Sequence, residues 1–297
     1  MINKLLDPVA LGASVAVLVA GIVLVTHWDP ISAGHPSYLV FYFGVIVTGA
    51  VTLVAILRRD TSRRRLSSVL GAGGLLVLGL AAWWLAPFPA DTIALEALSN
   101  PDGIEVRESP TSIQLEPSGE RSGTALTFYP GARVDARAYA RILTPIALAG
   151  HEVIIVKPPL GIAFLVFGVT RPEEATRWAL AGHSLGGVAA SAAVDPESDG
   201  LLLWASYPAS NLSGAADLMA SSIYGTADTF TTPDDIASSE PNLPSSTAFV
   251  PIPGGIHSFF GDYGSQPGDG VPTISRDEAQ DLIVAASLEL VESLGGE

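Results

Sequence analysis

The sequence predicts an α/β protein in which a mostly parallel sheet carries helices on both faces and is preceded by three transmembrane helices. Three observations predict this architecture. The first 87 residues hold three uninterrupted apolar segments, each of roughly the 20 residues that a bilayer requires. From residue 125 onward, short continuous apolar runs alternate with segments of helical pattern, as is typical of parallel strands buried on both faces. One of these runs ends in a Gly-x-Ser-x-Gly motif that leads directly into a helical segment.

The composition indicates a chain that is partly embedded in lipid and otherwise acidic. Its mean hydropathy of +0.41 is high for a soluble enzyme. Residues 1–87 contain six Lys or Arg and three Asp or Glu, whereas the remainder contains nine and 27, a net charge of −18. So acidic a surface disfavours nucleic acid and anionic lipid as partners. The chain has no Cys, which excludes disulfides, thiolate metal sites and a cysteine nucleophile. We predict no metal and no cofactor.

The three apolar segments cover residues 8–28, 38–57 and 66–85, and none contains a charged residue. Trp and Tyr side chains stand near their ends, where amphipathic rings prefer the headgroup region. This detail favours helices that span a membrane over helices buried in a protein core. The alternative for the first segment is a cleaved signal peptide, because Lys4 precedes its apolar run. We predict a multi-pass protein of the cell membrane, held in the lipid bilayer through residues 8–85.

The connectors between these segments predict an orientation. The second connector, Arg58 to Arg65, holds five arginines, whereas the first, residues 29–37, has no Lys or Arg. By the positive-inside rule the arginine connector and the amino terminus are cytoplasmic. The region that follows residue 85 is then predicted to be extracytoplasmic.

The rest of the chain is predicted to contain a linker with a β-hairpin and then one α/β domain. We place a membrane domain at 1–87, the linker and hairpin at 88–122, and the α/β domain at 123–297. Alternating patterns at 104–108 and 112–116 flank a Ser-Pro-Thr turn, which is typical of a hairpin. The predicted strands of the α/β domain are 125–129, 153–156, 178–181, 201–205, 222–224 and 248–252. The predicted helices are 135–148, 172–176, 185–194, 233–238 and 276–294.

The motif at residues 182–187, Gly-His-Ser-Leu-Gly-Gly, is the strongest chemical signal in the sequence. Between a strand and a helix, Ser184 must occupy a sharp turn that lifts its hydroxyl above the sheet edge. Glycines two residues to either side are expected there, because a Cβ would collide with neighbouring backbone. The following helix directs its amino-terminal N–H groups at the same place, where they stabilise negative charge. Ser184 is therefore the candidate nucleophile.

A serine hydroxyl needs an adjacent base, normally histidine. In proteins with this strand–turn–helix motif, the nucleophile, the acid and the histidine follow one another in that order along the chain. Only His257 satisfies the order, and it lies in a glycine-rich loop after the last predicted strand. The remaining histidines lie in the membrane segments, at a strand start or inside the motif itself: His27, His35, His151 and His183.

Several carboxylates lie between Ser184 and His257, and Asp228 is the best candidate for the acid. It follows a short predicted strand directly, which is where a carboxylate must lie to orient the histidine. Asp234 and Asp235 remain as alternatives, although both are well explained as first-turn residues of a helix. The oxyanion hole is expected to use the backbone N–H of Leu185 and one from the loop after the first central strand, either Gly131 or Ala132.

With these residues in place, residues 123–294 resemble the α/β-hydrolase superfamily, in particular the compact bacterial group called dienelactone-hydrolase-like. The resemblance rests on Phe-Tyr-Pro-Gly at 128–131, the motif at 182–187, Ile-Tyr-Gly-Thr-Ala-Asp at 223–228 and the Gly- and Asp-rich stretch at 254–270. It implies the α/β-hydrolase fold. Dienelactone hydrolases use a cysteine nucleophile, which this chain lacks, so their specific activity is not expected here.

The residues together predict a membrane-anchored serine hydrolase that cleaves a carboxylic ester or thioester through an acyl-Ser184 intermediate. The segment between the strands near 205 and 222 is too short for a helical lid, so a small-molecule or lipid-like ester would reach an open site. Two alternatives remain: acyl transfer by the same triad, and a non-catalytic membrane module that uses the fold for binding or sensing. The sequence makes no prediction of oligomeric state.

Overall fold

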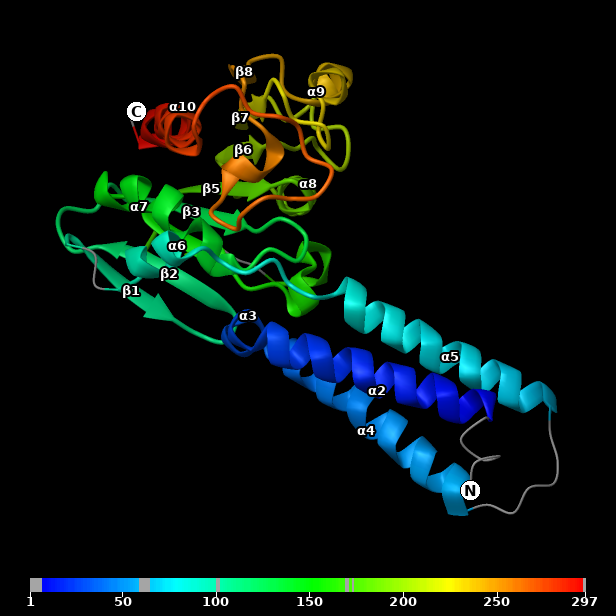
Figure 1. Cartoon of the computed structure of the whole chain (residues 1–297). Helices are drawn as coiled ribbons and strands as arrows, with labels where there is room; N and C mark the ends of the chain where they lie inside the picture. The colour runs from blue at the N-terminus through cyan, green and yellow to red at the C-terminus, as the bar shows by residue number, and fades with distance from the viewer. Residues whose placement is uncertain (1–6, 59–64, 100–101, 169–170, 173, 296–297) are drawn as a thin grey trace. The chain divides into compact units, whose positions relative to one another are not determined.

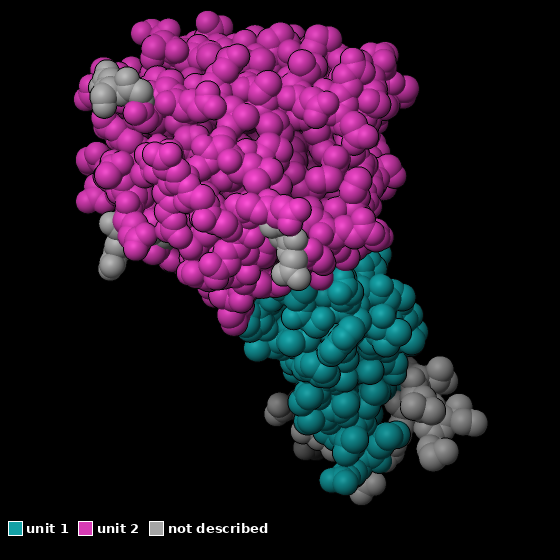
Figure 2. Space-filling model, turned by 90° about the vertical axis from the view of Figure 1, so that its left-hand side faces the viewer, with its two compact units in different colours: residues 1–87 teal, residues 88–297 magenta. Residues whose placement is uncertain are grey.

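The structure is a computed structural model, and it describes residues 7–58, 65–99, 102–168, 171–172 and 174–295. The chain divides into two compact units, Met1–Pro87 and Phe88–Glu297, which Figure 2 distinguishes by colour. The first unit is helical, and the second is built around one sheet.

The first unit consists of α2 (Pro8–Thr26), α3 (Trp28–Ala33), α4 (Ser37–Arg58) and α5 (Arg65–Trp84). Helix α2 begins where Asp7 accepts a hydrogen bond from the Val9 N–H and Pro8 occupies the first helical position. It packs against both α4 and α5 along a buried row of small residues that includes Ala13, Ala16 and Ala20. Small side chains let helix backbones approach closely, which is how apolar helices associate without a hydrophobic driving force.

Two of the three predicted membrane spans are matched by helices long and apolar enough to cross a bilayer, namely α2 and α4. In the third, α5, the apolar stretch found among the described residues is the shorter Leu70–Trp84. The arginine connector used to predict the orientation lies, at residues 59–64, outside the described residues.

The second unit contains an eight-stranded sheet in the order β1-β2-β4-β3-β5-β6-β7-β8 (Figure 1). Strands β3 to β8 run parallel, and the predicted hairpin β1–β2 joins this sheet at one edge, where β2 pairs antiparallel with β4. The predicted, mostly parallel sheet is therefore confirmed. The strands are β1 (Ile104–Glu108), β2 (Ser112–Pro117), β3 (Thr124–Tyr129), β4 (Glu152–Val156), β5 (Arg177–His183), β6 (Gly200–Trp204), β7 (Met219–Gly225) and β8 (Ala248–Ile252).

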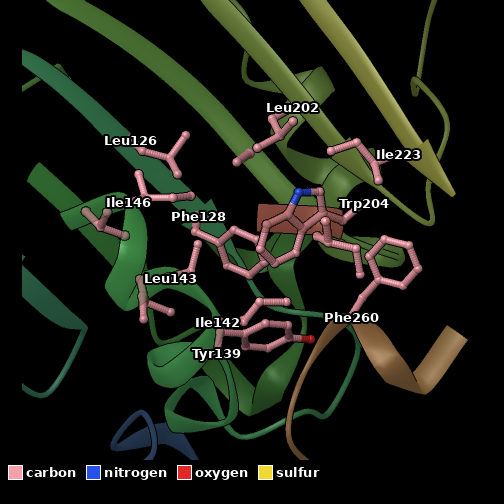
Figure 3. Close-up of a cluster of buried hydrophobic side chains, with 14 of the residues drawn as sticks. Leu126, Phe128, Tyr139, Ile142, Leu143, Ile146, Leu202, Trp204, Ile223 and Phe260 are labelled. Carbon is pink, nitrogen blue, oxygen red and sulfur yellow. The ribbon is translucent and has the colours of Figure 1, made fainter. Parts of the chain in front are cut away.

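Helices cover both faces of the sheet, because neighbouring strand residues point to opposite sides. One face packs Leu126, Phe128 and Trp204 against α7 and α10; Figure 3 shows part of this cluster. The other face packs Trp178 and Leu180 against α8. The helices of the unit are α6 (Thr92–Ala97), α7 (Ala140–Leu148), α8 (Leu185–Ala192), α9 (Pro233–Ser239) and α10 (Arg276–Gly295), and its 3-10 turns are η1 (Ala136–Tyr139), η2 (Pro159–Gly161), η3 (Ala163–Leu165), η4 (Glu240–Asn242) and η5 (His257–Phe260).

One predicted helix was wrong. The described residues around 172–176 are irregular or form a turn. The Arg171 side chain donates hydrogen bonds to the carbonyls of Ala175 and Thr176, and the Thr176 N–H donates to the Gly123 carbonyl. The backbone groups of Ala175 and Thr176 named here are therefore bound to partners outside a helical ladder, which satisfies them as well as a helix would.

Candidate active site

Ser184 lies between the end of β5 and the start of α8, in a backbone conformation (φ 53°, ψ −127°) that a residue with a side chain rarely adopts. A Cβ at Gly186 would collide with the Tyr129 carbonyl, and one at Gly182 would collide with the Gly186 backbone. Hydrogen bonds fix the turn: the Ser184 N–H donates to the Trp204 carbonyl (2.9 Å), and the Ser184 carbonyl accepts from the Ser206 hydroxyl (2.7 Å). The surrounding structure therefore holds a strained turn, and the Ser184 side chain at its tip is only partly buried.

Asp228 and His257 form a buried pair. Asp228 follows the end of β7, and His257 opens the turn η5 in the loop after β8. The His257 Nδ1 lies 2.7 Å from the Asp228 Oδ2, and both side chains are almost completely buried. The other carboxylate oxygen, Oδ1, accepts the N–H groups of Phe230 (2.8 Å) and Thr231 (2.9 Å). Because the carboxylate accepts from Nδ1–H, the imidazole keeps Nε2 as its unprotonated, basic nitrogen.

The alternatives to Asp228 have structural roles elsewhere. Asp235 accepts hydrogen bonds from the backbone and hydroxyl of Thr232, while its own N–H donates to that hydroxyl, which is a capping box at the start of α9. Asp234 is exposed in the first turn of the same helix. Of the three acids considered, only Asp228 contacts His257 in the described residues.

The nucleophile and the histidine lie at the same edge of the sheet. The ring of His183, the residue before Ser184, is 4.6 Å from the ring of His257. Within the described part of the chain no hydrogen bond joins the Ser184 hydroxyl to His257, so a nucleophile–base bond requires a rotation of the serine side chain or a small loop movement. Such bonds are often long in free enzymes and tighten with substrate.

The structure distinguishes the two backbone groups that the sequence left open for the oxyanion hole. The Gly131 N–H donates to the Tyr139 hydroxyl (2.9 Å). The N–H groups of Ala132 and Leu185 have no hydrogen-bond partner among the described residues. The backbone after β3 also lies directly against the start of α8, since a Cβ on Gly186 would meet the Tyr129 and Pro130 carbonyls. Of the three backbone groups predicted for the oxyanion hole, Ala132 and Leu185 therefore keep an N–H that is free within the described part of the chain.

The sequence did not single out Asp269, which positions the histidine loop. Its two carboxylate oxygens accept the N–H groups of His257 (3.1 Å) and Ser258 (2.8 Å), which fixes the start of η5. Phe230 was also missed, and its ring stands edge-on to the His257 imidazole with 5.3 Å between centroids. Both residues lie in loops, where hydrophobic periodicity gives no signal. An acid shortly after a candidate histidine was the one available sign of Asp269.

These features, a serine on a strained strand–helix turn, a buried Asp–His pair beside it and two free backbone donors, are the parts required for nucleophilic acyl chemistry. No curated protein matches the chain. A model described as the alpha/beta hydrolase family matches residues 125–281, which is more than half of the chain and includes all of the residues discussed above from Tyr129 to Asp269. The chain belongs to the alpha/beta hydrolase family.

Proposed function

We propose that the protein is a membrane-anchored serine hydrolase that cleaves a carboxylic ester or thioester. The observation that carries this proposal is the buried Asp228–His257 pair, 2.7 Å apart, beside Ser184 on its strained turn. A buried carboxylate that is hydrogen-bonded to an imidazole next to a strained serine is costly to maintain, and its known use is to activate the hydroxyl.

In the proposed reaction, the Ser184 oxygen attacks the acyl carbon while His257 Nε2 takes the hydroxyl proton. The oxygen of the tetrahedral intermediate accepts hydrogen bonds from the Leu185 and Ala132 N–H groups. The intermediate collapses to acyl-Ser184 as His257 returns the proton to the leaving alcohol or thiol. Water then attacks the acyl group with His257 again as base, which releases the acid and restores the serine.

The surface around the site favours a substrate with an apolar acyl group. Several large exposed apolar side chains of the second unit belong to the loops that follow the carboxyl ends of β4, β6, β7 and β8, the edge that holds Ser184. These residues, which we call the apolar rim, are Phe164, Leu165, Phe167, Tyr207, Phe230 and Val271. Exposed apolar side chains on an otherwise acidic domain match a neutral, lipid-like ester better than a charged one.

Membrane anchoring is supported by α2 and α4, which have the length and composition of membrane spans. We propose that α5 is a third span and that the arginine connector is cytoplasmic, which makes the hydrolase unit extracytoplasmic. Because the chain has no Cys, single-cysteine variants test this directly. In intact cells a membrane-impermeant maleimide should label Ser265→Cys but not Ser62→Cys; the reverse labelling would overturn the orientation.

The catalytic proposal is tested on the full chain in detergent. A fluorophosphonate probe should label the wild-type protein and leave Ser184→Ala unlabelled, and p-nitrophenyl esters from acetate to palmitate should be hydrolysed by the wild type alone. A folded wild-type protein that takes up no probe would favour a non-catalytic binding module. Product analysis with added alcohols would reveal acyl transfer in place of hydrolysis.

A further inference from the structure

Two buried polar side chains beside the triad have no role in the proposed reaction. Tyr139 ends the turn η1, and His183 is the last residue of β5. Both are almost completely inaccessible to solvent. Figure 3 shows the Tyr139 ring packed next to Phe128 in the core cluster, with its hydroxyl directed toward the side on which Phe260 lies. Buried polar groups cost free energy unless they are paired, so each of these needs an explanation.

Their hydrogen bonds form a chain with one defined direction. The Gly131 N–H donates to the Tyr139 hydroxyl oxygen (2.9 Å), so the hydroxyl proton is free to point toward His183 Nδ1, also 2.9 Å away. Nδ1 must then be the acceptor, and the ring holds its proton on Nε2. Burial raises the pKa of Tyr139 and, together with the neighbouring His257, lowers the pKa of His183 well below its usual 6.5. Both members therefore stay neutral.

The chain of hydrogen bonds from Gly131 through Tyr139 to His183 ends next to His257, the proposed catalytic base. The His183 ring stacks on Phe260 and lies 4.6 Å from the His257 ring. Its Nε2 is buried and has no hydrogen-bond partner among the described residues, while the His257 backbone partly offsets the lowering of the His183 pKa. His183 thus lies between two loops. On one side it is next to His257 in the loop after β8, and on the other it is linked through Tyr139 to the Gly131–Ala132 loop after β3, which we call the oxyanion loop.

The approach of the oxyanion loop to His183 is close. A Cβ on Gly131 would lie 2.9 Å from His183 Nδ1 and 3.2 Å from the Tyr139 hydroxyl. Only glycine lets the loop backbone reach these two groups without displacing them. The next residue is Ala132, whose free N–H is the candidate oxyanion donor. A small movement of this backbone would misplace a donor that must lie within hydrogen-bond distance of the developing oxyanion.

We propose that Tyr139 and His183 are positioning residues that hold the Gly131–Ala132 backbone, and with it one oxyanion donor, in register with Ser184 and His257. This inference rests on the proposed hydrolase function. In this proposal Tyr139 and His183 touch neither the substrate nor the reacting atoms. Because both are neutral, they place no positive charge beside the imidazolium that His257 becomes during the reaction. Their contribution is geometric and appears only when the tetrahedral intermediate forms.

The test is Tyr139→Phe in the full chain, which removes one oxygen and keeps the ring that packs on Phe128. We expect kcat to fall about 10- to 100-fold while KM changes less than about threefold, since an oxyanion donor acts on the transition state. The affinity for a trifluoromethyl ketone, which forms a tetrahedral adduct with the serine, should fall by the same factor as kcat/KM. A merely structural loss would lower the active fraction and leave inhibitor affinity unchanged.

Tyr263→Phe is the matched control. Tyr263 is also buried and its ring lies 6.2 Å from that of His183, but its hydroxyl donates to Gln266 at 3.2 Å, so its removal should leave kcat and inhibitor affinity unchanged. His183→Asn keeps an acceptor for Tyr139 and should retain more activity than His183→Leu. Wild-type kinetics in a folded Tyr139→Phe variant would overturn the proposal.

A measurement that does not need turnover covers the remaining outcomes. In the full chain labelled with ¹⁵N-histidine, the resonance lost in His183→Asn identifies His183. We expect its Nδ1 to be unprotonated and its Nε2 to be protonated. A proton on Nδ1 would overturn the proposed hydrogen bond from the Tyr139 hydroxyl to His183, even if Tyr139→Phe did not fold. If the tautomer is as expected but no ester is cleaved and no fluorophosphonate binds, the hydrolase proposal fails while the hydrogen-bond chain stands.

Discussion

Asp228→Asn is the sharpest test of the triad, because the structure dictates how the new amide must lie. The carboxylate Oδ1 accepts two backbone N–H groups, at 2.8 and 2.9 Å, and only the oxygen of Asn can replace it there. The Asn NH₂ group must then take the place of the Asp228 Oδ2, which lies 2.7 Å from His257 Nδ1 and accepts the Nδ1 proton in the wild type. Two donors cannot face one another, so the imidazole must move its proton to Nε2.

With Nε2 protonated, His257 cannot accept the proton of Ser184. We expect kcat/KM to fall by roughly 10⁴-fold, equivalent to about 5.4 kcal/mol of transition-state stabilisation. The fold should persist, because both backbone bonds to residue 228 are kept. The assay is hydrolysis of p-nitrophenyl butyrate by the full chain, with thermal unfolding to verify folding.

Two neighbouring acids provide the control. Asp234→Asn and Asp235→Asn change exposed residues of α9 and should alter kcat/KM by less than about twofold. The assignment of the acid would be refuted if kcat/KM of a folded Asp228→Asn protein fell by less than about tenfold. It would also be refuted if kcat/KM of an Asp234 or Asp235 variant fell by more than that of Asp228→Asn.

Three further predictions follow from strain, burial and surface composition. Ser184→Gly should raise the melting temperature by about 2–4 °C relative to Ser184→Ala, since glycine adopts φ 53° without the ~1 kcal/mol of strain. His183 is neutral when the protein is folded, because its pKa is lowered, and has its usual pKa of 6.5 when the protein is unfolded. Its contribution to stability is therefore complete above pH 6.5 and is lost as the pH falls toward the lowered folded pKa, by about 1.4 kcal/mol per pH unit. Urea unfolding between about pH 5 and 8 should show this slope in the wild type and a shallower slope in His183→Asn, and equal slopes would contradict the prediction. Phe167→Ser should lower kcat/KM for the palmitate ester relative to the acetate ester by about tenfold, whereas Leu148→Ser, which removes an exposed apolar side chain from the end of α7, should leave that ratio unchanged; an equal ratio in both variants would rule out acyl-chain contact at the rim.

The parts of the site that depend on local patterns could be predicted from the sequence. The turn at Ser184 was readable because strand, glycines and helix occur in succession, and His257 because it alone satisfies the chain order. Asp228 was chosen for its place after a strand, and the structure brings it to His257. Each inference used information contained within a few residues or in the order of elements along the chain.

The parts that depend on contacts between distant segments could not be predicted. Nothing near Gly131 in the sequence indicates that its N–H is taken by a tyrosine eight positions away, which leaves Ala132 as the free donor. In the sequence, His183 stands out only as a residue inside the motif at 182–187, and its hydrogen bond to Tyr139, 44 positions away, has no local sign. The irregular stretch at 172–176 follows from Arg171 and Gly123, which propensity does not consider.

The order of strands places Ser184 at the centre of the sheet and the other two candidate catalytic residues near its edge. Ser184 directly follows β5, which has β3 and β6 as partners and lies well inside the sheet, whereas Asp228 and His257 follow β7 and β8, and β8 is the outermost strand, with only one fully buried residue. Strands at a sheet margin open at lower free energy than those at its centre. Gentle heating should therefore detach the acid and the base from a serine that is still in place, so that catalysis ceases at a temperature below that at which the far-ultraviolet circular dichroism signal collapses, and returns on cooling.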